Sequence, residues 1–236
     1  MSRASTILTV AALGFGLCAA PPAAAEQVPV VVELYTSQGC SSCPPADAIF
    51  SKLSERDDVI AIALHVDYWD YIGWKDEFGH PAYAERQRKY ASKGGRRSVY
   101  TPEMVINGQT DIVGSDAMEL FKAIAHYKET PPPMSLDITR EGGNLHMQGS
   151  VPAGGAVPME IHVLRVKPSH TSKITRGENS GKTIQYSNIA HDWRVAGSWN
   201  GQAPLDLSFE VTGDDPVVVL VQETGAGPIV AAARVD

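Results

Sequence analysis

The most informative segment of the chain is Thr36-Ser37-Gln38-Gly39-Cys40-Ser41-Ser42-Cys43-Pro44-Pro45-Ala46-Asp47. Residues 28–35 lead into it as a run of β-branched and other apolar side chains, which predicts a strand. Residues 46–56 lead out of it with apolar side chains at helical spacing, which predicts a helix. The prolines between them fit a first helical turn, where a missing N–H has no cost. Cys40 and Cys43 therefore lie at the junction of a strand and a helix.

This position gives the two cysteines unequal chemistry. The N-terminus of a helix carries partial positive charge and free N–H groups, which favour a thiolate on the first cysteine. We expect Cys40 to be the exposed thiol that attacks a partner. We expect Cys43, one turn further on, to be the buried thiol that resolves the mixed disulfide. A Cys-x-x-Cys at such a junction indicates a redox dithiol.

Three other interpretations of the cysteine pair stay open. The first is an inert structural disulfide, although closing so small a loop constrains the unfolded chain little. The second is a metal-binding or metal-delivery protein, in which His65 or His80 adds to the two thiol ligands. The third is a non-catalytic interaction module with a residual dithiol. The context of strand and helix favours the redox interpretation, and we expect no metal in the site.

The first 25 residues are typical of a secretory signal peptide. Arg3 forms a short positive region, and residues 6–20 are apolar and uncharged. Ala23-Ala24-Ala25 offers small side chains for cleavage before Glu26. The apolar run is too short to span a bilayer, and Cys18 is removed with it. We expect a periplasmic or secreted protein without membrane association after cleavage.

Composition excludes some classes of partner. The chain of 236 residues has a formal net charge of −7, and removal of the predicted signal, which has one basic and no acidic residue, changes it to −8. An acidic exported protein is a poor match for nucleic acid or an anionic membrane surface. The sequence has no pattern typical of a phosphate loop, a nucleotide site or a Ser-His-Asp triad, so no cofactor is expected.

The first half of the chain alternates strand and helix patterns. Residues 59–66 form a second apolar strand pattern, and strand–helix–strand over this length predicts a right-handed βαβ unit. The later elements expected are a helix over residues 82–92, strands over residues 103–106 and 109–113 joined by Asn107-Gly108, and a helix capped by Ser115 or Asp116.

This order of elements resembles the thioredoxin fold over residues 28–129. In that fold a cis-proline faces the dithiol, and Thr101-Pro102 occupies the matching position. Thioredoxins also place a buried acid on the first strand, where it exchanges a proton with the resolving thiol, and Glu33 matches that acid. The resemblance implies that Pro102 shapes the substrate-binding groove beside the dithiol and blocks metal binding by the thiols. It also implies that Glu33 relays protons. The alternative for Glu33 is an ion pair with a Lys or Arg.

A longer pattern points to a narrower family. Its segments are Glu33-Leu34-Tyr35 with the stretch quoted first, His65-Val66-Asp67-Tyr68-Trp69-Asp70, and Tyr100-Thr101-Pro102-Glu103-Met104-Val105-Ile106-Asn107-Gly108. They are similar to a family of exported bacterial proteins known as domain of unknown function 1223, over nearly the whole predicted mature chain. This resemblance implies a thioredoxin-like domain and brings no established substrate.

Pro131-Pro132-Pro133 separates two parts of the chain that differ in amino-acid composition. Beyond it, short strand patterns alternate with Gly, Pro and Asn, which predicts a small antiparallel β-sandwich. These patterns cover residues 135–139, 144–151, 159–166, 182–188, 204–211, 217–222 and 229–235. Residues 175–181 and 191–199 are expected as a long hairpin or loop, and residues 225–228 as the turn of the last hairpin.

The predicted organisation is a signal peptide (1–25), a thioredoxin-like α/β domain (26–130), a proline linker (131–133) and an all-β, sandwich-like domain (134–236). The predicted function is an exported thiol–disulfide oxidoreductase that acts on protein thiols. Its expected catalytic-site residues are Cys40, Cys43, Pro102 and Glu33. Its expected partners are protein thiol or disulfide substrates, or a redox partner protein.

Overall fold

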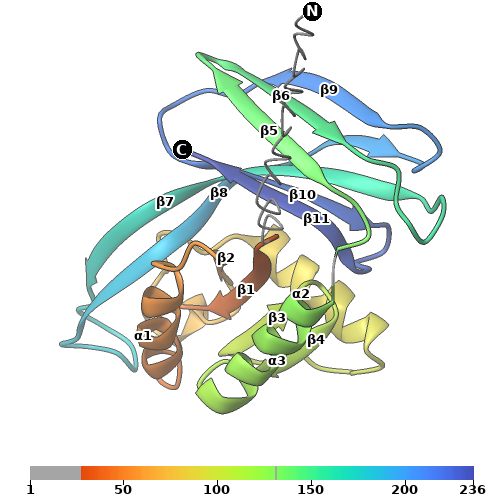
Figure 1. Cartoon of the computed structure of the whole chain (residues 1–236). Coiled ribbons are helices and arrows are strands. Elements are labelled where there is room, and N and C mark those ends of the chain that lie inside the picture. The colour runs from red at the N-terminus through yellow and green to blue at the C-terminus, as the bar shows by residue number, and fades with distance from the viewer. Residues whose placement is uncertain (1–27, 131) are drawn as a thin grey trace, which may run out of the picture.

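The computed structural model describes residues 28–130 and 132–236, so the predicted signal peptide lies outside the described residues. The elements in chain order are β1 (Val30–Thr36), α1 (Pro44–Leu53), β2 (Val59–His65), the 3₁₀ helix η1 (Asp70–Ile72), α2 (Pro81–Lys93), β3 (Glu103–Ile106), β4 (Thr110–Val113), α3 (Ala117–Glu129), β5 (Leu136–Glu141), β6 (Asn144–Gly149), β7 (Met159–Lys173), β8 (Thr183–Trp199), β9 (Leu205–Glu210), β10 (Val217–Glu223) and β11 (Ile229–Val235) (Figure 1). Within the described residues, none of these helices is long and apolar enough to cross a membrane.

The first half of the chain forms the pairings that its sequence predicts. β1 and β2 are parallel, β3 is antiparallel to β1, and β4 pairs with β3. Every residue of β1 and β2 is buried, because helices cover both faces of these strands. Leu34 of β1 packs in one cluster with Phe50 of α1 and Leu120 of α3. Tyr35, the next residue, belongs to the opposite cluster with Tyr83 of α2.

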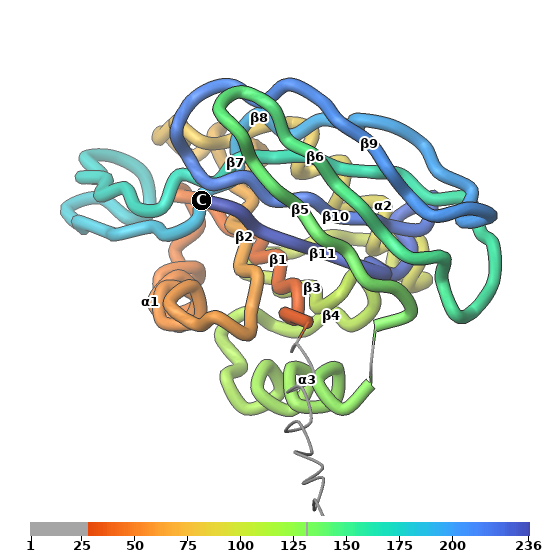
Figure 2. The backbone as a smooth tube through the Cα atoms, turned by 45° about the horizontal axis from the view of Figure 1, so that its top comes forward, coloured from red at the N-terminus to blue at the C-terminus, as the bar shows by residue number. Residues whose placement is uncertain are grey.

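The second half of the chain continues the same sheet. The eight strands lie in the order β11-β10-β7-β8-β2-β1-β3-β4, and β8 joins β2 through the parallel partners Ala63 and Ile189. A separate three-stranded sheet, β5-β6-β9, packs over part of it (Figures 1 and 2). The predicted thioredoxin-like α/β domain followed by a separate all-β domain is therefore wrong. The protein is built on one large mixed sheet that strands from both halves share.

The hydrophobic core shows why the halves do not separate. One cluster of buried side chains contains Tyr35 of β1, Leu64 of β2 and Tyr83 of α2, together with Leu164 of β7 and Leu220 of β10. Such a continuous set of apolar contacts identifies one core that crosses the predicted boundary. Local sequence pattern predicts which segments are strands, but the choice of neighbouring strand depends on this long-range packing.

β7 and β8 are much longer than their sequence patterns predict. They have 15 and 17 residues and pair as far as Lys173 and Thr183. Residues 191–199, expected outside the strands, belong to β8. The far part of this two-stranded arm runs beside α1 (Figures 1 and 2), where Ser51 Oγ and Ser187 Oγ are hydrogen-bonded over 2.8 Å. The arm thereby brings residues of the second half to the strand-to-helix junction of the first.

Candidate functional site

The two cysteines of the junction form a disulfide. The S–S distance is 2.09 Å and the Cα atoms are 5.4 Å apart. Cys43 is the N-cap residue of α1, and its carbonyl accepts the N–H groups of Ala46 and Asp47. The Cys43 N–H in turn donates to the Cys40 carbonyl over 3.2 Å. The dithiol is thus held against the N-terminal end of the helix, as the sequence predicts.

Thr101, which precedes Pro102, lies against this disulfide. The Thr101-Pro102 peptide bond is cis, which confirms the geometry that the resemblance implies. The hydroxyl of Thr101 donates to Cys40 Sγ over 3.2 Å, and Ser42 Oγ lies 3.4 Å from the same sulfur. Trp69 Nε1 donates to Thr101 Oγ1 over 2.7 Å, which leaves the Thr101 proton free for the sulfur. The Thr101 hydroxyl is therefore placed to stabilise a thiolate at Cys40, whereas the Ser42 hydroxyl also lies within 3.4 Å of the Thr101 carbonyl, to which it donates.

A glycine allows the proline to lie this close to α1. The Gly114 N–H donates to the Pro102 carbonyl over 2.9 Å. A Cβ atom at this glycine would lie 3.0 Å from the Pro102 Cβ and 3.3 Å from the Ala46 Cβ. Gly114, which follows β4, therefore belongs to the site through its lack of a side chain. No sequence motif points to this glycine.

Burial of Cys40 contradicts one expectation. Cys40 is 1% exposed and Cys43 is 0% exposed, so the exposed position predicted for Cys40 is wrong. Residues from β7–β8 cover the loop that carries it, and the Asn179 amide donates to the Cys40 carbonyl over 2.8 Å. No local pattern near Cys40 signals this burial, because Thr101 and Asn179, which pack on its sulfur and its backbone, lie 61 and 139 residues further along the chain.

Glu33 is buried on the face of β1 that α2 covers. Its carboxylate accepts from Arg86 Nε and from the Tyr90 hydroxyl, both over 2.7 Å. Arg86 also lies over the Trp193 ring of β8, 4.5 Å from the ring centroid. α1 packs on the opposite face. The structure therefore places Glu33 in an ion pair that joins β1 to α2, and it does not bring Glu33 to the dithiol.

Asp47 is a buried carboxyl on the helix that the dithiol precedes. It is 4% exposed and lies four residues after Cys43, on the same face of α1. Its Oδ1 accepts from Thr36 Oγ1 over 2.8 Å, whereas its Oδ2 is buried without a hydrogen-bond partner. Burial raises the pKa of Asp47 to about 7, although His65 and the Thr36 hydroxyl oppose this rise. Asp47 is not among the residues predicted from the sequence, where its one signal is an acid beside the apolar positions of a helix.

His65 and Asp76 form a buried pair near Asp47. His65, which ends β2, has its Nδ1 2.7 Å from Asp76 Oδ2, and both side chains are fully buried. Burial opposes the charge on His65, but the Asp76 carboxylate outweighs it and raises the pKa of His65. The His65 ring lies 4.9 Å from the Tyr186 ring of β8. His65 Nε2 and Tyr186 OH are, like Asp47 Oδ2, buried without a partner.

The described residues offer no grouped ligands for the metal site considered above. His65 is engaged with Asp76, and His80 is the N-cap of α2, where its Nδ1 accepts from the Ala82 N–H. Across residues 28–130 and 132–236, no three His, Cys, Asp or Glu side chains gather in a ligand set. Two thiols alone fall short of a four-ligand structural site.

These features describe a protein built mainly of sheet, with a closed Cys-x-x-Cys at a strand-to-helix junction and a cis Thr101-Pro102 bond beside it. Residues 31–222 match the family described as "Protein of unknown function (DUF1223)", and the chain belongs to that family. No curated protein matches the chain.

Two solved structures are similar to this one. Protein AGR_C_4864 from Agrobacterium tumefaciens has a TM-score of 0.77 and 28% sequence identity, and the match covers 90% of this chain and 96% of that one. HBP35 of Porphyromonas gingivalis has a TM-score of 0.62 and 16% identity, and the match covers 89% of this chain and 75% of that one. The second likeness shows a shared fold alone.

Proposed function

We propose that this protein is an exported thiol–disulfide oxidoreductase that exchanges electrons with protein thiols through Cys40 and Cys43. The observation that carries the proposal is the Cys40–Cys43 disulfide at the N-terminus of α1, with the Thr101 hydroxyl directed at the Cys40 sulfur. A helix N-terminus and hydroxyl donors favour a thiolate, and the thiolate is the form that attacks disulfides. An inert structural disulfide requires neither the helix N-terminus nor the hydroxyl donor.

The exchange is balanced in two steps. In the reduced protein the Cys40 thiolate attacks a sulfur of a substrate disulfide, so that a mixed disulfide forms and one substrate thiolate leaves. The Cys43 thiolate then attacks Cys40 Sγ, which closes the Cys40–Cys43 bond and releases the second substrate thiolate. The protein loses two electrons and the substrate gains them. The reverse sequence oxidises a substrate dithiol, and a redox partner protein resets the pair in either direction.

Asp47 is the proposed acceptor of the Cys43 proton. Cys43 is fully buried, and burial disfavours a thiolate, so its proton needs a nearby base. With a pKa raised to about 7, the Asp47 carboxyl can take up and release a proton near neutral pH. This role replaces the relay expected of Glu33, whose carboxylate is engaged with Arg86 on the other face of the sheet. Pro102, which is buried, is proposed to fix the position of Thr101 beside Cys40.

The experiment that tests this function is capture of a mixed disulfide. Without Cys43 the second step fails, so Cys43→Ala, exported with its own N-terminal segment, accumulates protein adducts on Cys40. Non-reducing gels of alkylated extracts show these adducts, and reductant releases them. Cys40→Ala is the matched control and captures none. Equal adducts on both variants, or none on Cys43→Ala, would refute the proposal.

Export is a separate part of the proposal. It rests on the charge and apolar pattern of residues 1–25 and agrees with a persistent disulfide, which oxidising compartments favour. Mass spectrometry of the protein from the periplasm or medium is expected to show Glu26 as the first residue. A mature protein that keeps Met1, or that carries a lipid on Cys18, contradicts this part.

A further inference from the structure

Cys40 is buried, although the two residues that follow it are exposed to solvent. Ser41 and Ser42, between the two cysteines, are exposed, whereas Cys40 is only 1% exposed. A protein thiol needs an unobstructed approach to the sulfur that it attacks. The structure therefore raises the question of which segment limits access to Cys40.

The hairpin tip, defined as residues 174–182 between β7 and β8, packs on the backbone of Cys40. Asn179 Nδ2 donates to the Cys40 carbonyl over 2.8 Å and to the Gln38 carbonyl over 2.9 Å. Its Oδ1 accepts from Lys182 Nζ over 2.8 Å. Asn179 is 1% exposed, so these bonds are shielded from water. One side chain thus links the hairpin tip to the loop that carries the dithiol.

A second set of contacts holds the base of the hairpin tip. Gln38 donates to Ser172 Oγ over 2.9 Å and accepts from Trp74 Nε1 over 2.7 Å. Gly177, at φ +73°, approaches Trp74 so closely that an added Cβ would lie 3.2 Å from the Trp74 Cβ. The hairpin tip therefore closes the dithiol loop against the segment that follows β2.

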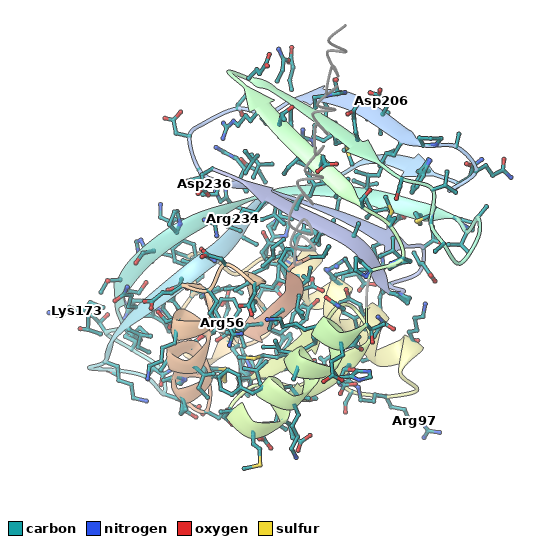
Figure 3. All side chains as sticks on the ribbon, in the orientation of Figure 1. Arg56, Arg97, Lys173, Asp206, Arg234 and Asp236 are labelled. Carbon is teal, nitrogen blue, oxygen red and sulfur yellow. A yellow bond between two sulfur atoms is a disulfide. The ribbon has the colours of Figure 1, made fainter. Side chains whose placement is uncertain are left out.

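Most of the hairpin tip is otherwise in water. Apart from Ile174, Gly177 and Asn179, its residues are exposed. Lys173, where β7 ends, points into solvent at the far end of the arm (Figure 3). The stem beside it pairs only within the β7–β8 hairpin, because β8 meets β2 further along, at Ile189. Segments with few buried contacts and exposed backbone open at low free energy.

We propose that Asn179 is a specificity-determining residue, because it latches the hairpin tip on the backbone of Cys40 and so restricts the approach of protein thiols more than that of small thiols. This inference rests on the proposed function and adds a regulated access step to it. The latch opens when the two donations from Asn179 break, and a partner that supplies its own N–H groups to the carbonyls of Gln38 and Cys40 replaces them. Partners that present such backbone donors are therefore favoured over other protein thiols.

The test compares two reductants on the oxidised full-length protein. Dithiothreitol serves as the small thiol, and reduced, unfolded ribonuclease A serves as the protein thiol; the loss of the Cys40–Cys43 disulfide is followed by mass. Asn179→Asp keeps the size of the side chain and its bond with Lys182 but loses both donations. Ser180→Ala is the matched control, because the Ser180 hydroxyl bonds only within the hairpin tip, to the Thr175 carbonyl.

If Asn179 acts as this latch, its replacement changes the rate of reduction by the protein thiol much more than the rate of reduction by the small thiol. Asn179→Asp increases the rate with ribonuclease thiols about tenfold and the rate with dithiothreitol less than twofold, whereas Ser180→Ala changes neither. Equal rates in Asn179→Asp and wild type overturn the latch, as does the same increase with both reductants. If Asn179→Asp does not fold, Lys182→Met, which removes the charge that steadies Asn179, must show a smaller change in the same direction. A wild-type disulfide that dithiothreitol does not open in the folded protein instead refutes the proposed function.

Discussion

The hydroxyl of Thr101 donates a hydrogen bond to the sulfur of Cys40 over 3.2 Å, from the residue that immediately precedes Pro102. Trp69 fixes the direction of this hydroxyl by donating to its oxygen. In the oxidised protein the acceptor is a neutral disulfide sulfur, which is a weak partner. On reduction the same donor faces a thiolate, and the bond becomes charge-assisted and stronger. The relationship therefore links the proline-containing segment to the reactivity of one cysteine.

Replacement of this threonine tests that link. In Thr101→Val the thiolate of reduced Cys40 loses a donor, and we expect its alkylation midpoint to rise by about one pH unit, which corresponds to about 1.4 kcal/mol. Iodoacetamide rates between pH 5 and pH 9, with Cys43→Ala as background, measure the midpoint. Thr110→Val, whose hydroxyl bonds Tyr127, is the matched control and leaves it unchanged. An unchanged midpoint in Thr101→Val contradicts the prediction.

Asp47 gives the stability a distinctive pH dependence. Its pKa of about 7 in the folded protein lies above the value of 3.8 expected in the unfolded chain. The stability that the protonated carboxyl contributes is therefore present below pH 3.8 and lost as the pH rises through 7. Asp47→Asn removes this loss, so we expect it to raise the free energy of unfolding at pH 8 by up to about 4 kcal/mol.

Urea unfolding at pH 4 and pH 8 measures this effect. The gain of Asp47→Asn over wild type is expected to be small at pH 4 and largest at pH 8. Asp57→Asn replaces an exposed acid four residues beyond α1 and serves as the control, with little difference at either pH. An Asp47→Asn variant that is less stable than wild type at pH 8 would show that the buried carboxylate is favourably solvated.

Glu33 is expected to act on stability and not on the thiols. Glu33→Gln leaves the buried guanidinium of Arg86 without its carboxylate, so we expect a loss of about 3–5 kcal/mol in the free energy of unfolding. Glu85→Gln, on the exposed side of α2, is the control. The alkylation midpoints of both cysteines should stay at their wild-type values. A changed midpoint for Cys43 would restore the proton relay to Glu33.

Local sequence pattern is sufficient to predict most helices and strands and the position of the dithiol. The β-branched run of β1, the prolines that begin α1 and the Asn107-Gly108 turn each have a short-range physical cause, and the structure places all three as expected. The strand patterns of the second half were also found. The neighbours of these strands do not follow from local pattern, because strand pairing depends on packing between residues far apart in sequence, as in the parallel pairing of β2 with β8 at Ala63 and Ile189.

The same limit applies to the site. Cys40 is expected at the surface from its own segment, but Thr101 lies against its sulfur and Asn179, on a distant hairpin, packs on its backbone. Glu33 and Asp47 are both acids near the cysteines in sequence, and alternation along β1 sends Glu33 to the face under α2. A carboxyl in the first turn of a helix ordinarily complements the helix dipole at the surface. Only the packing of α1 on β8 and β2 shows that Asp47 is buried.

The most direct test of the central claim is the redox equilibrium of the Cys40–Cys43 pair in folded protein. The metal-free protein is equilibrated in buffers of defined thiol–disulfide potential, and the fractions of dithiol and disulfide are read by mass after alkylation, with circular dichroism as a check of folding. We predict one reversible two-electron transition, at a potential between about −120 and −270 mV, while the fold persists. A disulfide that stays closed below about −300 mV, or that opens only as the protein unfolds, would identify a structural bond and contradict the account.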